Sequence, residues 1–486
     1  MLFNSVHFAL FFPIIFLTYW FIVNKNLKSQ NILLLFSSYF FYACWDWRFL
    51  FVLVFSTFLD YFSGLKMSNS LNQRHKKFWL ILSISVNLGI LGVFKYYNFF
   101  ANSFAESISH LGFNVSPLTL NIVLPIGISF YTFHGISYLI DIYRDKIKAE
   151  KNIVEYAVFV SFFPLLVAGP IERATNLLPQ LKVKREFDYT KAVDGLRQIL
   201  WGLVKKVFIA DNCAEMANLI FNNSENCSGS TLVLGALFFS IQIYGDFSGY
   251  SDIALGTARL LGIELLQNFS FPYFSRDIAE FWRRWHISLS SWFREYVYIP
   301  LGGSKGSTWL KVRNTFIIFI LSGFWHGANW TFLIWGALNA IYFLPLLLLN
   351  RNRQHLEIVA KGKLLPSLKE FINISITFSL TVFAWIFFRA NNVEHAINYI
   401  SRIFSASLFS LPSGQSFNGS QLHPVFVTVS VLLFILIEWV GREEKYALAK
   451  INAIPIKPLR WFLYYSLCFS VLYLSGKEQQ FIYFQF

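Results

Sequence analysis

Residues 314–349 read NTFIIFILSGFWHGANWTFLIWGALNAIYFLPLLLL. This apolar run is too long for one ordinary membrane helix, because about 20 residues are enough to cross the hydrocarbon core of a bilayer. Basic residues stand on both sides of it, namely Lys311, Arg313, Arg351 and Arg353. Since short loops rich in Lys and Arg face the cytoplasm, both ends are expected on one side of the membrane. The sequence therefore predicts a helical hairpin that breaks around Gly327.

Two histidines, His286 and His326, are the most informative residues of the chain. Measured from the cytoplasmic end of the hairpin, His326 would lie about 20 Å into a core about 30 Å thick. An imidazole exchanges its proton near neutral pH, and its burial in lipid costs free energy unless it is fully hydrogen-bonded or has a chemical task. A catalytic role and a helix-bridging role are the two interpretations of this pair.

Composition fixes the class of protein. The 486-residue chain is 55% hydrophobic and 19% aromatic, with only 14% charged side chains, which excludes an ordinary soluble domain. The formal charge of +14 would suit nucleic acid, but the basic residues are dispersed between apolar spans. We therefore expect no nucleic-acid partner and positive loops that face anionic membrane lipids.

The remaining apolar segments predict an all-α polytopic membrane protein with a single integral domain over residues 1–486. A run at 153–170 is interrupted by two prolines and has basic residues on both sides, so it is expected to be re-entrant. The four cysteines show no spacing typical of a metal site or a disulfide framework. The predicted spans are 7–23, 31–47, 49–65, 78–99, 119–143, 192–210, 231–258, 371–389, 424–440 and 461–476.

The charges of the loops give one consistent topology. Basic loops at 66–77, 144–151, 259–313, 350–370 and 441–460 are assigned to the cytoplasm. The loops 100–118, 211–230 and 391–423 contain among them only one Lys or Arg, Arg402, and are assigned to the outside. The last span then delivers the C-terminus to the extracytoplasmic side.

Residues 278–298 predict one interfacial helix on the cytoplasmic side. Trp282, His286, Ser290 and Arg294 follow at i, i+4 spacing and would share one face. Glu280 and Arg284 are expected to form a solvated pair on another face. The nearby basic residues predict a collar that either anchors to anionic lipid or captures a phosphate-bearing donor. This collar consists of Arg283, Arg284, Arg294, Lys305, Lys311 and Arg313.

The span 231–258 carries acidic residues that need partners in lipid. Gln242, Asp246 and Tyr250 fall on one helical face, and Asp246 is expected to orient a polar group in a tunnel wall. Asp252 lies nearer the cytoplasmic end, where a structural partner such as Arg259 would suffice.

Two long motifs resemble the signature of the membrane-bound O-acyltransferase family. They are FWRRWHISLSSWFREYVYIPLGG at 281–303 and SGFWHGANW at 322–330. The likeness is greatest to the bacterial cell-envelope branch, which includes the alginate, peptidoglycan and cellulose O-acetyltransferases and the D-alanyl transfer protein for teichoic acid.

This resemblance implies a helical funnel of about 11 to 12 transmembrane or re-entrant segments. It implies that His326 is the principal catalytic residue and His286 its partner. It also implies an acyl-acceptor motif at 481–486, in which Tyr483 receives the acyl group; an aromatic residue of the membrane interface is the alternative for Tyr483. The substrate-binding residues are expected to be Arg283, Arg284, Ser290, Arg294, Asn329, Trp325, Asp246 and Tyr250.

The expected activity is transfer of an acetyl group from cytosolic acetyl-CoA, without a bound cofactor or metal, in the bacterial cytoplasmic membrane. The acceptor chain would run through Tyr483 to an extracytoplasmic SGNH-like acetyltransferase that modifies a cell-envelope polysaccharide or exopolysaccharide such as alginate or peptidoglycan. Three alternatives remain at this point: a family member that acylates a protein or lipid, D-alanyl transfer, and a non-enzymatic transporter that uses the buried His and Asp residues.

Overall fold

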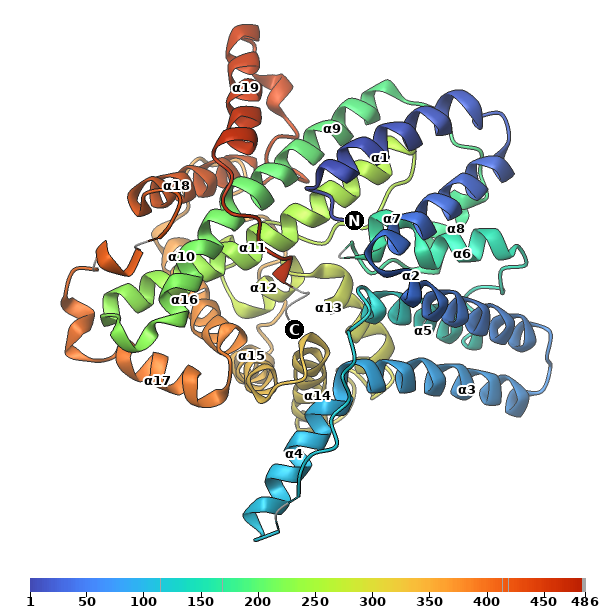
Figure 1. Ribbon diagram of the computed structural model, residues 1–486, viewed down its shortest axis with the longest axis horizontal. Coiled ribbons are helices and arrows are strands. Elements are labelled where there is room, and N and C mark those ends of the chain that lie inside the picture. The colour runs from blue at the N-terminus through green and yellow to red at the C-terminus, as the bar shows by residue number, and fades with distance from the viewer. Residues whose placement is uncertain (114, 168, 413, 418, 483–486) are drawn as a thin grey trace. The chain divides into compact units, whose positions relative to one another are not determined.

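The computed structural model describes residues 1–482 apart from 114, 168, 413 and 418 (Figure 1). Every regular element in these residues is a helix, which confirms the all-α prediction. Tyr483 and the rest of the motif 481–486 after Ile482 lie outside the described residues.

The chain divides into two compact units. The first contains residues 1–189 and 258–266, and the second contains residues 190–257 and 267–486. The single integral domain expected over residues 1–486 stays a prediction.

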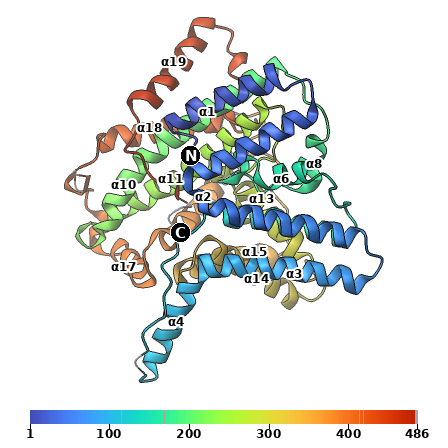
Figure 2. The same cartoon turned by 45° about the vertical axis from the view of Figure 1, so that its right-hand side comes forward.

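The first unit is a helical bundle around α2, which packs against α3, α5 and α6. Helices α2, α3 and α6 are labelled in Figure 2. Helix α2 (Leu27–Ser68) bends at Asp46, whose extended backbone (φ −158°, ψ 110°) separates the two predicted spans 31–47 and 49–65. The other helices of this unit are α1 (Val6–Leu17) with a π-helical turn (Thr18–Ile22), α3 (Gln73–Leu91), a π-helical turn (Gly92–Tyr96), α4 (Tyr97–His110), α5 (Ile128–Tyr143), α6 (Ile153–Ser161), α7 (Phe163–Leu166) and α8 (Ala174–Leu181).

Two predicted segments of this unit differ from the structure. The span expected at 119–143 becomes helical only at α5, because Pro125 and the left-handed Gly127 (φ 75°) precede its first turn. The run 153–170 forms the two short helices α6 and α7, divided at Phe162. Neither helix is long enough to cross a bilayer, and the re-entrant path itself stays a prediction.

The second unit carries both histidines. Its helices are α9 (Tyr189–Leu203), a π-helical segment (Val204–Ala210), α10 (Asp211–Asn222), α11 (Gly229–Leu260), α12 (Ile278–Arg284), α13 (Ile287–Phe293), a π-helical segment (Arg294–Tyr298), α14 (Thr308–His326), α15 (Trp330–Leu348), α16 (Leu368–Arg389), α17 (Val393–Ile403), α18 (Pro424–Gly441) and α19 (Lys457–Tyr473), with short 3₁₀ turns at Ser224–Asn226, Pro272–Phe274, Ala406–Phe409, Gly414–Phe417 and Ile451–Ala453. The last three residues of α11, 258–260, belong to the first unit.

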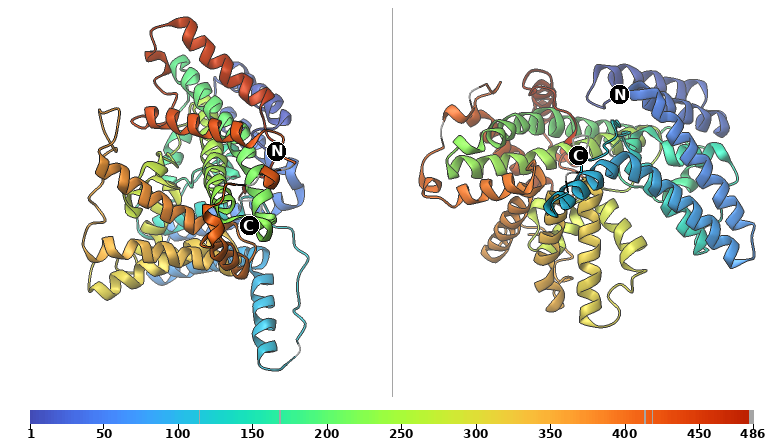
Figure 3. Two further views of the ribbon diagram at one scale, coloured as in Figure 1. Left: turned by 90° about the vertical axis from the view of Figure 1, so that its left-hand side faces the viewer. Right: turned by 60° about the horizontal axis from the view of Figure 1, so that its bottom comes forward.

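The hairpin predicted from residues 314–349 is present as α14 and α15, which lie side by side (Figure 3). The chain breaks at Gly327–Asn329, as the sequence predicts. Two glycines allow the helices to touch. A Cβ atom on Gly323 would collide with the Phe332 carbonyl oxygen, and one on Gly336 would collide with the Phe319 carbonyl oxygen.

Among the described residues, six helices are long and apolar enough to cross a membrane. They are Leu27–Ser68, Gln73–His110, Gly229–Leu260, Trp330–Leu348, Leu368–Arg389 and Pro424–Gly441. The protein is therefore an all-α, multi-pass membrane protein.

Replacing Gly336 with Val should loosen the α14–α15 hairpin, because the new side chain meets backbone that cannot move aside. We expect a loss of about 1–3 kcal/mol, the usual cost of overpacking, measured as a lower thermal unfolding temperature in detergent. Gly89→Ala is the matched control, since a Cβ atom there meets nothing within 4 Å. Equal unfolding temperatures for the two variants would contradict the close helix contact.

Candidate active site

His286 occupies a sharp break between α12 and α13. Its backbone is left-handed (φ 43°, ψ 53°), a conformation that costs a residue other than glycine about 1–3 kcal/mol and that is frequent at functional sites. The prediction of one continuous helix over 278–298 is therefore wrong at this residue. Trp282 and Ser290 do not lie one helical turn from the imidazole along a shared face.

Asn268 holds this break in place. Its backbone carbonyl accepts the Ile287 N–H (2.9 Å), and its side-chain oxygen accepts the Ser288 N–H (3.3 Å) and the Ser288 hydroxyl (2.9 Å). The amide nitrogen of Asn268 donates to the Ser251 hydroxyl (3.2 Å). One residue thus supplies the partners that the interrupted helix would otherwise provide.

The same amide determines the tautomer of His286. The Nδ1 atom lies 3.0 Å from Asn268 Oδ1, and that oxygen must be the acceptor because the Ser288 backbone N–H can only donate. His286 therefore carries its proton on Nδ1, and Nε2 keeps its lone pair. Burial lowers the pKa of the His286 imidazole to about 3, so the ring is neutral at physiological pH.

His326 is the last residue of α14, where the hairpin breaks. The residue is 3% exposed, and its ring is surrounded by aromatic rings. The ring centroids of Trp325, Trp335 and Phe388 lie 5.0, 5.2 and 5.3 Å from that of His326.

The two histidines face each other across a short distance. Their ring centroids are 6.4 Å apart, and Trp325 contacts both rings, at 5.9 Å from His286 and 5.0 Å from His326. An atom placed between the rings could approach both. The structure therefore brings together the two residues that the sequence singles out.

A cavity of about 600 Å³ opens beside α13 and α14. Its size is in the range of small-molecule sites, about 300–1,000 Å³. It reaches Ile287, which follows His286, and Ser322, which lies one helical turn before His326. The charged and hydroxyl side chains on its wall include Arg283, Arg294, Arg353, Ser290 and Ser304.

Trp282 connects the wall of this cavity to the aromatic rings around His326. Its indole lines the cavity and contacts Trp335 (centroids 5.7 Å apart) and Phe319 (5.4 Å). Its Nε1 atom donates to Asn339 Oδ1 (3.3 Å). Trp335 in turn contacts His326, so two indoles in contact lead from the cavity to the imidazole.

The C-terminal segment lies near His286, with one aromatic ring between them. Phe481 and Ile482 are each 1% exposed. The Phe481 ring contacts Phe247 (centroids 5.9 Å apart), and Phe247 contacts His286 (4.6 Å). The described part of this segment thus reaches the aromatic shell of the histidines.

The comparisons with known proteins agree with this geometry. Residues 144–388, about half of the chain, match the model of the membrane-bound O-acyltransferase family. The chain belongs to that family. As a member it is a multi-pass membrane O-acyltransferase.

Three relatives illustrate the range of the family. A probable alginate O-acetylase, AlgI of Pseudomonas aeruginosa, is 40% identical over 92% of this chain and 82% of its own length. The peptidoglycan O-acetyltransferase of Helicobacter pylori is 37% identical over 85% of this chain and 81% of its own. The teichoic acid D-alanyltransferase of Bacillus subtilis is 28% identical over 57% of this chain and 71% of its own.

The expected substrate-binding residues of this acyltransferase differ in location. Arg283, Ser290 and Arg294 line the cavity, and Trp325 contacts both histidines. The remaining collar residues Arg284, Lys305, Lys311 and Arg313 are not on the cavity wall.

Two other expected residues make structural contacts. Arg284 Nη2 donates to Glu280 Oε1 (2.8 Å), which confirms the pairing expected from the sequence, but Glu280 is 1% exposed, so the pair is buried rather than solvated. Glu280 also binds Arg276 at 3.0 Å. Asn329 caps α15: its Oδ1 accepts the Thr331 N–H (3.0 Å) and its Nδ2 donates to the Asn391 carbonyl (2.9 Å).

Asp246 and Tyr250 face the C-terminal segment. Asp246 Oδ2 accepts the Ile482 N–H at 2.7 Å, and the Tyr250 ring lies 4.9 Å from the ring of Phe481. One polar group that Asp246 orients is thus the backbone of this segment.

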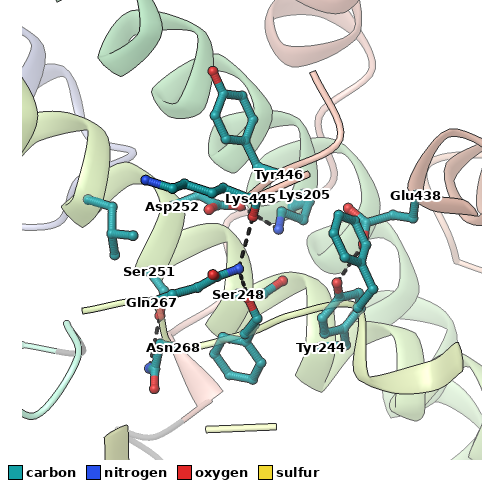
Figure 4. Close-up of a pocket in the computed structure, with 13 residues that line it drawn as sticks. Lys205, Tyr244, Ser248, Ser251, Asp252, Gln267, Asn268, Glu438, Lys445 and Tyr446 are labelled. Atoms are coloured by element: carbon teal, nitrogen blue, oxygen red, sulfur yellow. Dashed lines mark hydrogen bonds and ion pairs between the residues drawn. The ribbon is translucent and has the colours of Figure 1, made fainter. Parts of the chain in front are cut away.

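A second buried cluster lies next to Asn268 (Figure 4). Lys205 Nζ pairs with Asp252 at 2.5 Å, which corrects the expected pairing of Asp252 with Arg259. Glu438 accepts from Tyr244 (2.5 Å) and Trp201 (2.9 Å). Neither Glu438 nor Asn268 was predicted from the sequence. Glu438 is a lone carboxylate in an apolar span, and that could have served as a signal. Nothing in the local sequence pattern marks Asn268.

Removing the Asn268 side chain should cost activity through the tautomer of His286. Asn268→Ala should lower kcat about 10- to 100-fold, the usual effect of losing a group that orients a functional histidine. Asn268→Asp should retain more activity, because a carboxylate still accepts the Nδ1 proton. Solid-state ¹⁵N NMR of labelled histidines should show the parent His286 protonated at Nδ1, without titration between about pH 5 and pH 8. An imidazolium signal for His286 at pH 6 would contradict this assignment.

Proposed function

We propose that this acyltransferase moves an acetyl group from cytosolic acetyl-CoA to Tyr483. The acetyl group then passes to an extracytoplasmic SGNH-like transferase that O-acetylates a cell-envelope polysaccharide or exopolysaccharide. The enzyme would act in the bacterial cytoplasmic membrane with its C-terminus on the extracytoplasmic side. The observation that carries this proposal is the pair of buried histidines, 6.4 Å apart, with the basic cavity and the C-terminal segment both nearby.

The cavity is the proposed binding place of the donor. Acetyl-CoA carries phosphates, which guanidinium groups bind well. Arg294 has a side chain 64% exposed at the cavity wall, so it can meet a phosphate that arrives from solvent. Arg283 is held in place because its two terminal nitrogens donate to the carbonyls of Asn352 and His355, both at 2.8 Å.

The chemistry is acyl transfer from sulfur to oxygen. His326 acts as general base and takes the proton of the attacking hydroxyl while the oxygen forms a bond to the thioester carbonyl carbon. The carbon–sulfur bond then breaks, and the proton passes to the departing thiolate. The hydroxyl has a single proton, which goes to His326, so His286 positions the reacting groups by contact of its ring rather than by accepting that proton. The base step needs a neutral His326 imidazole, because a protonated ring cannot take a proton.

A tyrosine suits the role of first acceptor. The ester of a phenol remains activated, so its acetyl group can be transferred again to a sugar hydroxyl. Tyr483 follows Ile482, whose backbone is already at the aromatic shell of the histidines. The relay would also solve a problem of location, because the donor is cytosolic and the polysaccharide is outside the cell.

The test is to incubate the purified enzyme with acetyl-CoA labelled in the acetyl group. We expect a base-labile label on the protein, found on Tyr483 by peptide mass spectrometry, and none in Tyr483→Phe or His326→Ala. Label that persists in both variants would overturn the relay. Label transfer to a lipid or protein acceptor by Tyr483→Phe would favour the alternative acceptor classes. Transfer of D-alanine from a carrier protein, without transfer of acetyl, would mean that the donor is a D-alanyl carrier and not acetyl-CoA.

Arg294 should contribute to donor binding rather than to chemistry. Arg294→Gln should raise KM for acetyl-CoA about three- to tenfold, as expected for one partly screened charge contact. The value of kcat should change little, because such a contact is equal in the ground state and the transition state. Arg74→Gln, at an exposed arginine of α3, is the control. An unchanged KM for Arg294→Gln would remove this residue from the donor site.

Trp282 should restrict the length of the acyl group. Trp282→Ala enlarges the cavity toward Trp335, which contacts His326, so the kcat/KM ratio of butyryl-CoA to acetyl-CoA should rise about tenfold or more, the scale set by one or two methylene groups. Trp309→Ala, which removes an exposed indole from the first turn of α14, should leave the ratio unchanged. An unaltered ratio in Trp282→Ala would place the acyl group elsewhere.

A further inference from the structure

Residues 474–482, here called the tail, follow α19 and run along α10. Side chains at successive turns of α10 hold it, which indicates a specific path rather than a loose end. The contacts are Asn212 Nδ2 to the Leu474 carbonyl (2.9 Å), Lys477 Nζ to Glu215 Oε1 (3.2 Å) and Asn218 Nδ2 to Gln479 Oε1 (3.3 Å).

A buried ion cluster then binds the tail through its main chain. Lys206 Nζ lies 2.8 Å from both Asp211 Oδ1 and Asp246 Oδ1, and the side chains of Lys206 and Asp246 are each 3% exposed. Lys206 also donates to the Gln479 carbonyl (3.2 Å), and Asp246 Oδ2 accepts the Ile482 N–H (2.7 Å). One ammonium group faces two carboxylates, so the excess negative charge favours a donor such as the Ile482 N–H.

Two further residues fix the register of the tail. A Cβ atom on Gly476 would lie 2.8 Å from the backbone of Asp211 and Asn212, so only glycine fits at this crossing. Phe481 is held between the rings of Phe247 (5.9 Å) and Tyr250 (4.9 Å). A shift of the tail by one residue would bring a side chain to the crossing that Gly476 occupies. It would also remove the Phe481 ring from its position between Phe247 and Tyr250.

We propose that Lys206 and Asp246 are positioning residues that dock the tail and so fix where residue 483 stands relative to the two histidines. This inference rests on the proposed function of Tyr483. The pair binds the backbone carbonyl of residue 479 and the backbone N–H of residue 482. It therefore fixes the position of the tail through the backbone, independently of most side chains of the tail. Neither residue needs to touch the donor or the reacting atoms.

Ile482→Pro tests the dock without altering the buried ions. Proline lacks the N–H that Asp246 accepts, and the change lies beyond α19, where it leaves the helices intact. Ile482→Val keeps the N–H and a similar side chain and is the matched control. Gly476→Val is a second, independent way to lift the tail. Substituting Lys206 itself would leave buried carboxylates without a counter-charge and would confuse unfolding with undocking.

Two measurements are made on each variant. Digestion with carboxypeptidase Y, which also releases proline, followed by intact mass should remove no residue before Ile482 in the parent and in Ile482→Val, and should continue toward Leu474 in Ile482→Pro and Gly476→Val. The rate of labelling of Tyr483 by labelled acetyl-CoA should fall at least tenfold in the last two variants. Acetylation of a free phenol, N-acetyltyrosine amide, should be kept or increased, since the catalytic residues are unchanged.

The outcomes separate the two proposals. If Tyr483 is labelled in the parent and Ile482→Pro retains both the digestion limit and the labelling rate, the dock is overturned while the relay stands. If the parent shows no label on Tyr483, the relay is overturned, and the digestion limit alone decides whether the tail is docked. Loss of free-phenol acetylation together with labelling would mean that the change damages the catalytic centre, which also contradicts a positioning role.

Discussion

The hydrogen bonds of Asn268 are the interaction on which the site depends. Its carbonyl and side chain satisfy the backbone where α12 ends and α13 begins, and its side chain holds the Nδ1 proton of His286. Without these bonds, a left-handed histidine in an apolar interior would be strained and poorly oriented. The same contact that makes the break tolerable therefore also fixes which nitrogen of His286 accepts a proton.

Two features of the structure lie near the histidines. Aromatic rings surround His326, and polar interactions are stronger where such rings exclude water. The indole of Trp282 lines the cavity, and Phe481 of the tail contacts Phe247. In the proposed relay, the cavity serves the donor and the tail carries the acceptor to the same pair of imidazoles.

Sequence reasoning succeeds where the signal is local. The length and flanking charges of residues 314–349 predict the α14–α15 hairpin, and the strongly apolar runs predict most long helices. The two histidines are recognisable because an ionisable ring is unexpected among Trp, Phe and Gly. Pro125 and Gly127 are helix-breaking signals in the sequence. The span predicted from hydrophobicity alone nevertheless begins at residue 119, before both of them.

It fails where the decisive partner is distant. Residues 278–298 have helical spacing, and the break at His286 arises from an asparagine 18 residues earlier that competes for the backbone. A partner of Asp246 is the N–H of Ile482, 236 residues away, which no local pattern reveals. Tyr483 lies outside the described residues, so its proposed role follows from the motif and from the position of Ile482.

The aromatic shell of His326 also gives the protein an optical signature. The indoles of Trp335 and Trp385 are stacked, with centroids 5.5 Å apart and planes inclined by 20°. Transition dipoles this close couple, and a coupled pair in a chiral setting produces a paired positive and negative band in far-ultraviolet circular dichroism. Because Trp335 also contacts His326, a change in the packing around this imidazole would alter the band.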